Sequence, residues 1–193
     1  MNIEILYTSI YSYLLGSIPF GYVLIKFFLN EDLRKIGSGN IGATNVLRTG
    51  KKSLGVLTLF LDGLKGYIAL TITFIYFPDY IYLSALICFL AHIFPVWLKF
   101  KGGKGIAVFL GILFYLSIKF GIIFIISWIL ILYLTKYSSV SSLMSTGLIF
   151  LYSIYLKNSF ESLFFFIILV IVIYTHRENI IRLKNKKENK ITL

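Results

Sequence analysis

The chain has 193 residues, of which 58% are hydrophobic, a mean hydropathy of +0.87 and a formal net charge of +11. This composition excludes an ordinary soluble domain and predicts an integral membrane protein. The excess of basic residues favours loops that face an anionic cytoplasmic leaflet, and it argues against nucleic acid as a partner because those residues are scattered between apolar runs.

Seven apolar runs follow one another along the chain, near residues 3–25, 54–77, 80–98, 106–117, 119–135, 142–156 and 160–176. Residues 106–134 fit either one overlong helix or two short ones that turn at Ser117–Lys119. With seven spans and the N-terminus outside, Lys119 and Lys157 are the only basic residues left outside, whereas six spans would place the basic tail there. We therefore predict an all-α integral membrane protein with seven transmembrane helices, some of them short, and a cytoplasmic C-terminus.

The first run begins close to Met1 and has Glu4 but no basic stretch ahead of it, so we expect a retained helix and not a cleaved signal peptide. It contains GSIPFGY at residues 16–22, where Pro19 should break the helix and release backbone carbonyls inside the membrane. This break fits a packing kink between small residues better than direct contact with a ligand.

A polar loop at residues 35–50, KIGSGNIGATNVLRTG, follows the first run, and we call it the first glycine loop. Its glycines allow positive φ angles that turn backbone N–H groups inward, its short polar side chains donate hydrogen bonds, and Arg48 offers a planar fork suited to phosphate. A flexible connector is the alternative. The candidate phosphate-binding residues in this loop are Ser38, Gly39, Asn40, Asn45 and Arg48.

The second run contains LDGLKG, in which Asp62 and Lys65 are three residues apart and share one helix face. Each charge alone would cost about 2.5 to 3.5 kcal/mol at the centre of a bilayer, so we expect the two to pair. The pair is either purely structural, or Asp62 holds Lys65 or a loop arginine at the rim of a site. We take both residues, with His92 of the third run, as supporting residues.

The third run ends in AHIFPVWLKFKGGKG at residues 91–105, and its FKGGKG segment, residues 100–105, is the second glycine loop. The loop lacks the spacing and the strand-to-helix context of a nucleotide P-loop, and it fits a phosphate-binding nest better. Lys104 is expected to open the next helix, where its ammonium group and the helix dipole would act on the same anion. The candidate phosphate-binding residues here are Lys101, Gly102, Gly103 and Lys104.

Two further polar segments, SSVSS at residues 138–142 and HREN at residues 176–179, fall on the cytoplasmic side of the predicted topology, as do both glycine loops. Four polar segments therefore converge on one face. The basic tail, residues 176–193, alternates apolar and charged residues as an amphipathic helix on a membrane surface does. Without an evident repeat or linker, residues 1–193 read as a single domain.

These motifs, in this order and spacing, resemble the bacterial acyl-phosphate-dependent glycerol-3-phosphate acyltransferases of the PlsY type, over nearly the whole chain. The resemblance implies a seven-helix enzyme of the inner membrane, with its active site facing the cytoplasm, that catalyses the first acylation of phospholipid biosynthesis. It implies transfer of an acyl group from acyl phosphate to the 1-hydroxyl of sn-glycerol 3-phosphate, giving lysophosphatidic acid and orthophosphate. The family has glycine in place of Ala91 and near Lys186. The site residues that the resemblance implies are Ser38, Arg48, Lys104, Ser142, His176 and Asn179.

The chemistry of the residues agrees with this family. Acyl phosphate is an activated anhydride, so its reaction needs no metal, no cofactor and no covalent intermediate, and Cys88, in an apolar run, is expected to be a core residue. Two phosphates must be bound, and two glycine loops are present. We expect His176, Asn179 and Lys104 to be the catalytic residues, with a phosphate oxygen of the donor favoured over His176 as the base.

The expected partners are the two small substrates and membrane lipids, and we expect a monomer. Phe94, Trp97 and Phe100 fit an aromatic belt at the membrane boundary better than an acyl-chain groove. A small anion transporter would also use basic glycine loops and broken helices, but it predicts polar segments on both faces, and the outer face is nearly bare. A structural subunit would not need Arg48, Lys104 and the histidines together.

Overall fold

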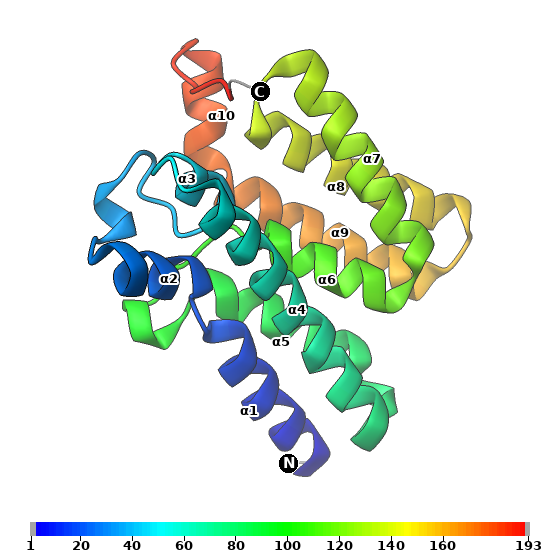
Figure 1. Ribbon diagram of the computed structural model, residues 1–193. Coiled ribbons are helices and arrows are strands. Elements are labelled where there is room, and N and C mark those ends of the chain that lie inside the picture. Colours follow the sequence, from blue (N-terminus) through cyan, green and yellow to red (C-terminus); the bar gives the residue numbers. More distant parts are fainter. Residues whose placement is uncertain (1–2, 192–193) are drawn as a thin grey trace. The chain divides into compact units, whose positions relative to one another are not determined.

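The structure, a computed structural model, describes residues 3–191, so the last two residues of the predicted tail lie outside it. Helices make up most of this range, and it contains no strand (Figure 1). The chain forms two compact units that divide between Leu116 and Ser117. The predicted all-α class is therefore confirmed, and the single domain expected for residues 1–193 stays a prediction.

The first unit is built around one long helix. Helix α4 (Lys52–Tyr76) packs against α1 (Ile3–Ser17), α5 (Ile81–Ile93) and α6 (Ile106–Leu116), and α1 also packs along α5. Helices α4 and α6 approach so closely that a Cβ at Gly111 would overlap the backbone of Gly63, the close packing that small residues permit between membrane helices. The remaining elements are α2 (Phe20–Leu29), α3 (Ala43–Leu47) and three 3₁₀ turns, η1 (Leu33–Lys35), η2 (Pro78–Tyr80) and η3 (Val96–Leu98).

The predicted break in the first apolar run is present. Helix α1 ends at Ser17 and α2 begins at Phe20, with Pro19 between them. The interruption releases the carbonyl of Ile18, which accepts a hydrogen bond of 2.6 Å from Lys65 Nζ of α4. Polar pairs also join the helices inside the unit, among them Ser12 with Ser84, whose hydroxyl oxygens are 2.7 Å apart.

The second unit consists of α7 (Ile118–Thr135), α8 (Ser138–Tyr155), α9 (Ser159–Thr175) and α10 (Arg177–Lys184), with α8 packed between α7 and α9. Ser117 caps α7 by accepting a hydrogen bond from the backbone N–H of Lys119. Residues 106–134 are therefore two helices, as the charge argument predicted. Helix α10 leaves α9 at an angle of 58° after the turn at His176.

Four helical segments of residues 3–191 are long and apolar enough to cross a membrane, and a fifth results if α9 and α10 are counted as one bent span. Helix α6 is apolar but has only 11 residues. Large apolar side chains such as Phe27 and Tyr155 lie about four-fifths exposed, which suits contact with lipid. The seven-span count and the orientation of the termini stay predictions.

Candidate active site

The first glycine loop is shaped by one buried amide. Asn45, in α3, accepts hydrogen bonds at Oδ1 from the backbone N–H and the hydroxyl of Ser38, at 2.9 and 3.2 Å. Its Nδ2 donates to three backbone carbonyls of the loop, those of Leu33, Ile36 and Asn40. Because the amide of Asn45 is engaged with the loop itself, its geometry supports a shaping role more than direct contact with phosphate.

Positive φ angles occur at three of the four glycines of this loop. Gly37, Gly39 and Gly50 have φ values of 55°, 72° and 80°. Gly42 is extended instead, with φ −81°, and precedes α3. A Cβ at Gly37 would meet the amide oxygen of Asn45 and the aliphatic stem of Arg48, so glycine is needed there for space as well as for conformation.

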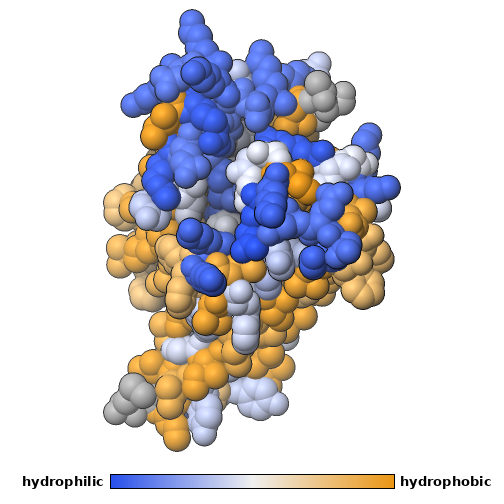
Figure 2. Space-filling view, turned by 90° about the vertical axis from the view of Figure 1, so that its left-hand side faces the viewer, coloured by the Kyte–Doolittle hydropathy of each residue, from blue (hydrophilic) through white to orange (hydrophobic). Residues whose placement is uncertain are grey.

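Charged groups in and just before the first glycine loop lie at the protein surface. Arg48 is exposed at the end of α3, with its stem beside Gly37. Asp32, just before η1, accepts hydrogen bonds from the Arg34 guanidinium, and these bonds lower its pKa to about 2. Figure 2 shows hydrophilic residues gathered above the hydrophobic surface of α1.

One apolar cluster supports both glycine loops. Its fully buried members come from α2, η1, the first glycine loop, α3 and η3, and they are Ile25, Leu33, Ile41, Val46 and Leu98. Leu98 lies two residues before the second glycine loop, so this loop and the first one border the same cluster. The structure therefore brings the two predicted anion-binding loops together at one end of the first unit.

The second glycine loop folds back on the end of α5. The N–H groups of Gly102 and Gly103 donate to the carbonyls of Ile93 and His92, at 2.9 and 3.0 Å. A Cβ at Gly103 would overlap the His92 ring. Lys101 is exposed, and Lys104 is half-buried. Helix α6 begins at Ile106, so Lys104 lies two residues before the helix that it was predicted to open.

Asp62, Lys65 and His92 form a buried cluster behind this loop, the Lys65 cluster. Lys65 Nζ lies 2.8 Å from Asp62 Oδ1 and 2.9 Å from His92 Nδ1. Asp62 Oδ1 has no donor with hydrogen-bond alignment, so its contact with Lys65 is an ion pair. Lys65 Nζ also donates a hydrogen bond of 2.6 Å to Ile18 O, so the ammonium group has one anionic and two neutral neighbours. The predicted pairing of Asp62 with Lys65 is confirmed.

In the second unit, two predicted site residues are buried and held by their neighbours. The Ser142 hydroxyl donates to Ser138 O and accepts from Trp128 Nε1. His176 follows α9, and its Nδ1 lies 2.8 Å from Val172 O. Since a carbonyl only accepts, Nδ1 carries a proton.

Asn179 contacts a residue that the sequence analysis missed. Its Nδ2 donates to Glu188 Oε1 at 2.6 Å, and Ser139 and Arg182 donate to the same carboxylate. Burial raises the pKa of Glu188, but these donors outweigh it and lower that pKa overall. No local pattern singles out this glutamate, because its partners depend on how the tail folds back.

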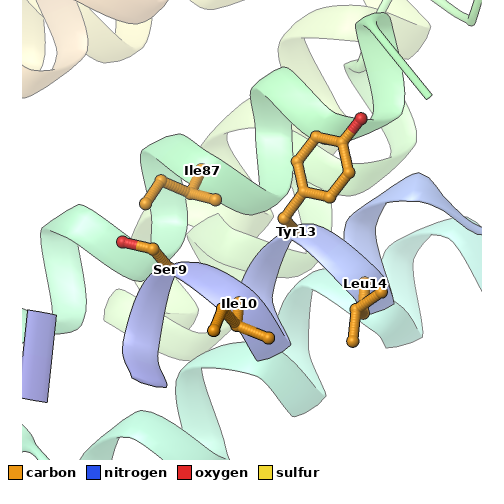
Figure 3. Close-up of a pocket in the computed structure, with 5 residues that line it drawn as sticks. All are labelled: Ser9, Ile10, Tyr13, Leu14 and Ile87. Carbon is orange, nitrogen blue, oxygen red and sulfur yellow. The ribbon is translucent and has the colours of Figure 1, made fainter. Parts of the chain in front are cut away.

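Two observations bear on ligands. Among the described residues, no group of three or more His, Cys, Asp or Glu side chains is placed to hold a metal ion. An apolar hollow of about 370 Å³ lies on the flank of α1 and α5, lined by Ser9, Ile10, Tyr13, Leu14 and Ile87 (Figure 3).

Cys88 is buried in the interior of the first unit, as expected for a core residue.

Long apolar helices and two basic glycine loops on a shared apolar cluster define the class: a multi-pass membrane protein with two basic loops beside one another. Residues 6–186 match the family described as glycerol-3-phosphate acyltransferase. The chain is 53% identical to the glycerol-3-phosphate acyltransferase of Pelagibacter ubique, over 97% of both chains, and 49% identical to that of Ehrlichia canis, over 99% of this chain and all of the relative. The chain therefore belongs to the glycerol-3-phosphate acyltransferase family, and it is an acyltransferase.

Solved structures agree with this assignment. The crystal structure of PlsY, an integral membrane glycerol 3-phosphate acyltransferase, in its glycerol 3-phosphate form, matches with a TM-score of 0.91 at 38% identity, over 97% of this chain and 96% of that one. Its lysophosphatidic acid form matches with a TM-score of 0.88 at 37% identity, over 97% and 95%. The fold is thus that of an integral membrane acyltransferase of phospholipid synthesis.

Proposed function

We propose that the protein transfers the acyl group of acyl phosphate to the 1-hydroxyl of sn-glycerol 3-phosphate, giving lysophosphatidic acid and orthophosphate. The observation that carries this proposal is the likeness to PlsY in two forms, one with glycerol 3-phosphate and one with lysophosphatidic acid. These two molecules differ by one acyl group. They are therefore the acceptor and the product of a single transfer.

The choice of acyl phosphate as the acyl donor rests on the basic residues of the two glycine loops. Acyl phosphate presents a phosphate group as its recognition element, and the acceptor presents another. The two glycine loops carry cations suited to these phosphates, namely exposed Arg48 and Lys101 and half-buried Lys104. In this proposal Ser38, Gly39, Asn40, Gly102 and Gly103 line the phosphate sites, and Ser142 is a further phosphate-binding residue.

In the reaction, the oxygen of the acceptor hydroxyl forms a bond to the acyl carbon. The bond from that carbon to the bridging phosphate oxygen breaks, and its electron pair leaves with orthophosphate. Arg48 and Lys104 stabilise the charge that develops on the leaving phosphate. A phosphate oxygen of the donor takes the hydroxyl proton, while His176 is the alternative base.

The cellular setting belongs to the same proposal. The protein is a monomer with seven spans, its N-terminus outside the bacterial plasma membrane and its site facing the cytoplasm, where glycerol 3-phosphate is dissolved. The acyl chain of the donor enters from the lipid, since each buried methylene is worth about 0.8 kcal/mol.

Purified protein in detergent, supplied with a long-chain acyl phosphate and glycerol 3-phosphate, is expected to release orthophosphate and lysophosphatidic acid in equal amounts. Omission of either substrate should abolish both products. Turnover with an acyl thioester and none with acyl phosphate would reject the donor. Uptake of glycerol 3-phosphate into sealed vesicles without any acylated product would favour a transporter instead.

A further inference from the structure

The ammonium group of Lys65 contacts both sides of the break in the first apolar run. Its Nζ donates to the carbonyl of Ile18, just before Pro19, at 2.6 Å. The same Nζ lies 5.7 Å from the centroid of the Phe20 ring, at the first residue of α2. The Lys65 side chain is only 2% exposed, and charge-assisted contacts are strong away from water. Lys65 therefore fixes the point at which α2 leaves α1.

Helix α2 in turn holds the first glycine loop. Gly21, in the first turn of α2, lies so close to this loop that a Cβ there would overlap the carbonyl oxygen of Ile41. One turn further along, Ile25 is fully buried in the apolar cluster together with Ile41 and Val46. Because protein interiors are close-packed, a displacement of α2 would displace the first glycine loop as well.

The second glycine loop is held by another neighbour of Lys65, the His92 ring. His92 Nδ1 lies 2.9 Å from Lys65 Nζ. The far side of the ring reaches Gly103, where a Cβ would overlap the ring nitrogen Nε2. The N–H of Gly103 also donates to the carbonyl of His92 at 3.0 Å. The position of the second glycine loop therefore depends on the ring that Lys65 contacts.

We propose that Lys65 is a positioning residue that sets the distance between the two glycine loops, and thereby the distance between the two substrate phosphates. This inference rests on the proposed function, in which each loop binds one phosphate, and deepens it. Lys65 touches no substrate, and it acts through α2 on the first loop and through His92 on the second. An error in this distance slows the transfer between two bound substrates, while each loop still binds its own phosphate.

The first test removes the ammonium group and leaves no unpaired charge. In Asp62→Leu Lys65→Met, apolar side chains of similar size replace the buried ion pair, a change that proteins often tolerate. Single turnovers are followed with enzyme and glycerol 3-phosphate in saturating excess over acyl phosphate, so that the rate constant reports the folded enzyme alone. We expect this rate constant to fall about tenfold or more, while the Kd of glycerol 3-phosphate changes less than about threefold.

Lys52→Met is the matched control, because it removes a lysine from the exposed start of the same helix. We expect both quantities to equal those of the wild type. If the double variant does not fold, Asp62→Asn Lys65→Gln replaces it with the same expected result, because a glutamine side chain is one bond shorter than lysine and does not reach both neighbours. A folded variant of either kind with a rate constant within about twofold of the wild type overturns the inference.

The second test measures the distance between the loops. Spin labels are attached at Lys35→Cys in the first glycine loop and Lys99→Cys just before the second, both at exposed positions, after the buried Cys88 has been replaced by alanine. Electron spin resonance gives the distance distribution between the labels. We expect this distribution to shift or broaden when the ammonium group is removed. A distribution that stays unchanged overturns the inference.

The third test exchanges size across the contact between His92 and Gly103. His92→Asn keeps an acceptor for Lys65 at the position of Nδ1 but loses the ring atoms beside Gly103, whereas Gly103→Ala adds a methyl group where Nε2 lies. Each single variant should slow the single turnover. In the double variant the methyl group occupies the space of the lost ring atoms, and we expect at least a tenfold gain over the slower single variant.

A folded His92→Asn Gly103→Ala variant that is no faster than the slower single variant overturns the inference, even if one single variant fails to fold. Failure of the proposed function is a separate result, because it would show in the wild type. Wild-type protein that forms no lysophosphatidic acid from the two substrates rejects the proposed function. Active wild-type protein with Asp62→Leu Lys65→Met at the full rate constant rejects only the role of Lys65.

Discussion

Lys65 Nζ lies 2.9 Å from His92 Nδ1 in the interior of the first unit, where both side chains are at most 4% exposed. An ammonium group only donates, so Nδ1 of His92 is the acceptor and the ring proton is on Nε2. The ring packs against Gly103, whose N–H donates to the His92 carbonyl. The Lys65 cluster thus supports the second glycine loop from behind.

Lys65→Met is expected to destabilise the protein strongly, because it leaves Asp62 as an unpaired buried carboxylate. Loss of one partner of a buried ion pair typically costs about 3 to 5 kcal/mol. Thermal unfolding in detergent measures the change. Asp62→Leu Lys65→Met removes both charges and should be milder than the single variant. The control is Lys52→Met on the exposed start of α4, which should have the melting temperature of the wild type.

Gly103→Ala is expected to displace the second glycine loop, because the added methyl group overlaps the His92 ring. A shift of about 1 Å in a positioning loop can cost on the order of a hundredfold in rate. Steady-state kinetics of acyl transfer would show it. Gly147→Ala in α8 has open space at the new Cβ and should retain full activity. Equal activity of the two variants would mean that the loop tolerates displacement.

Local signals in the sequence were sufficient for most helix positions. Ser117 and Lys119 marked the turn between α6 and α7 because a cap residue and a charge interrupt an apolar run. Pro19 marked the end of α1 for the same kind of reason. The pairing of Asp62 with Lys65 was predictable because three residues of helix bring them onto one face.

The partners of the site residues were less predictable, because they come from distant parts of the chain. Asn45 was expected to contact phosphate, but its amide is used by carbonyls up to 12 residues away. Nothing near Pro19 indicates that Lys65, 47 residues later than Ile18, takes the released carbonyl. Glu188 belongs to a tail that was predicted as an amphipathic helix, and only the folded position of that tail shows its three donors.

Asn45→Asp is expected to disrupt the first glycine loop although the change is nearly isosteric. The new carboxylate cannot donate to the three carbonyls that Nδ2 now holds, and its charge repels them. We expect kcat/KM for glycerol 3-phosphate to fall about a hundredfold. Asn30→Asp is the control, since Asn30 is an exposed helix cap that accepts from Lys26, a role that aspartate also fills. Full activity of Asn45→Asp would contradict the shaping role.

The stabilising contribution of Glu188 should depend on pH in the direction of its shifted pKa. That pKa is lower in the folded protein than the ordinary value of 4.5, because Asn179, Arg182 and Ser139 hold the charged form. The contribution is therefore complete above pH 4.5 and is lost as the pH falls through the lower folded value. The difference in melting temperature between the wild type and Glu188→Gln should be constant near neutral pH and shrink below pH 4.5. A difference that grows on acidification would contradict this sign.

Arg48→Ala and Lys104→Ala test whether the two glycine loops bind anions. Each should lower kcat/KM about ten- to hundredfold, because each removes a charge-assisted contact to phosphate. Arg48→Lys keeps the charge but loses the planar fork, so it should recover only part of the loss. Lys51→Ala removes an exposed charge just after the first glycine loop and should have little effect.

Since the loops border one apolar cluster, the double variant Arg48→Ala Lys104→Ala removes cations from both loops at the same end of the unit. Undiminished turnover of that double variant would show that neither loop uses its cation for catalysis, and the assignment of the two loops to the two substrate phosphates would fall with it.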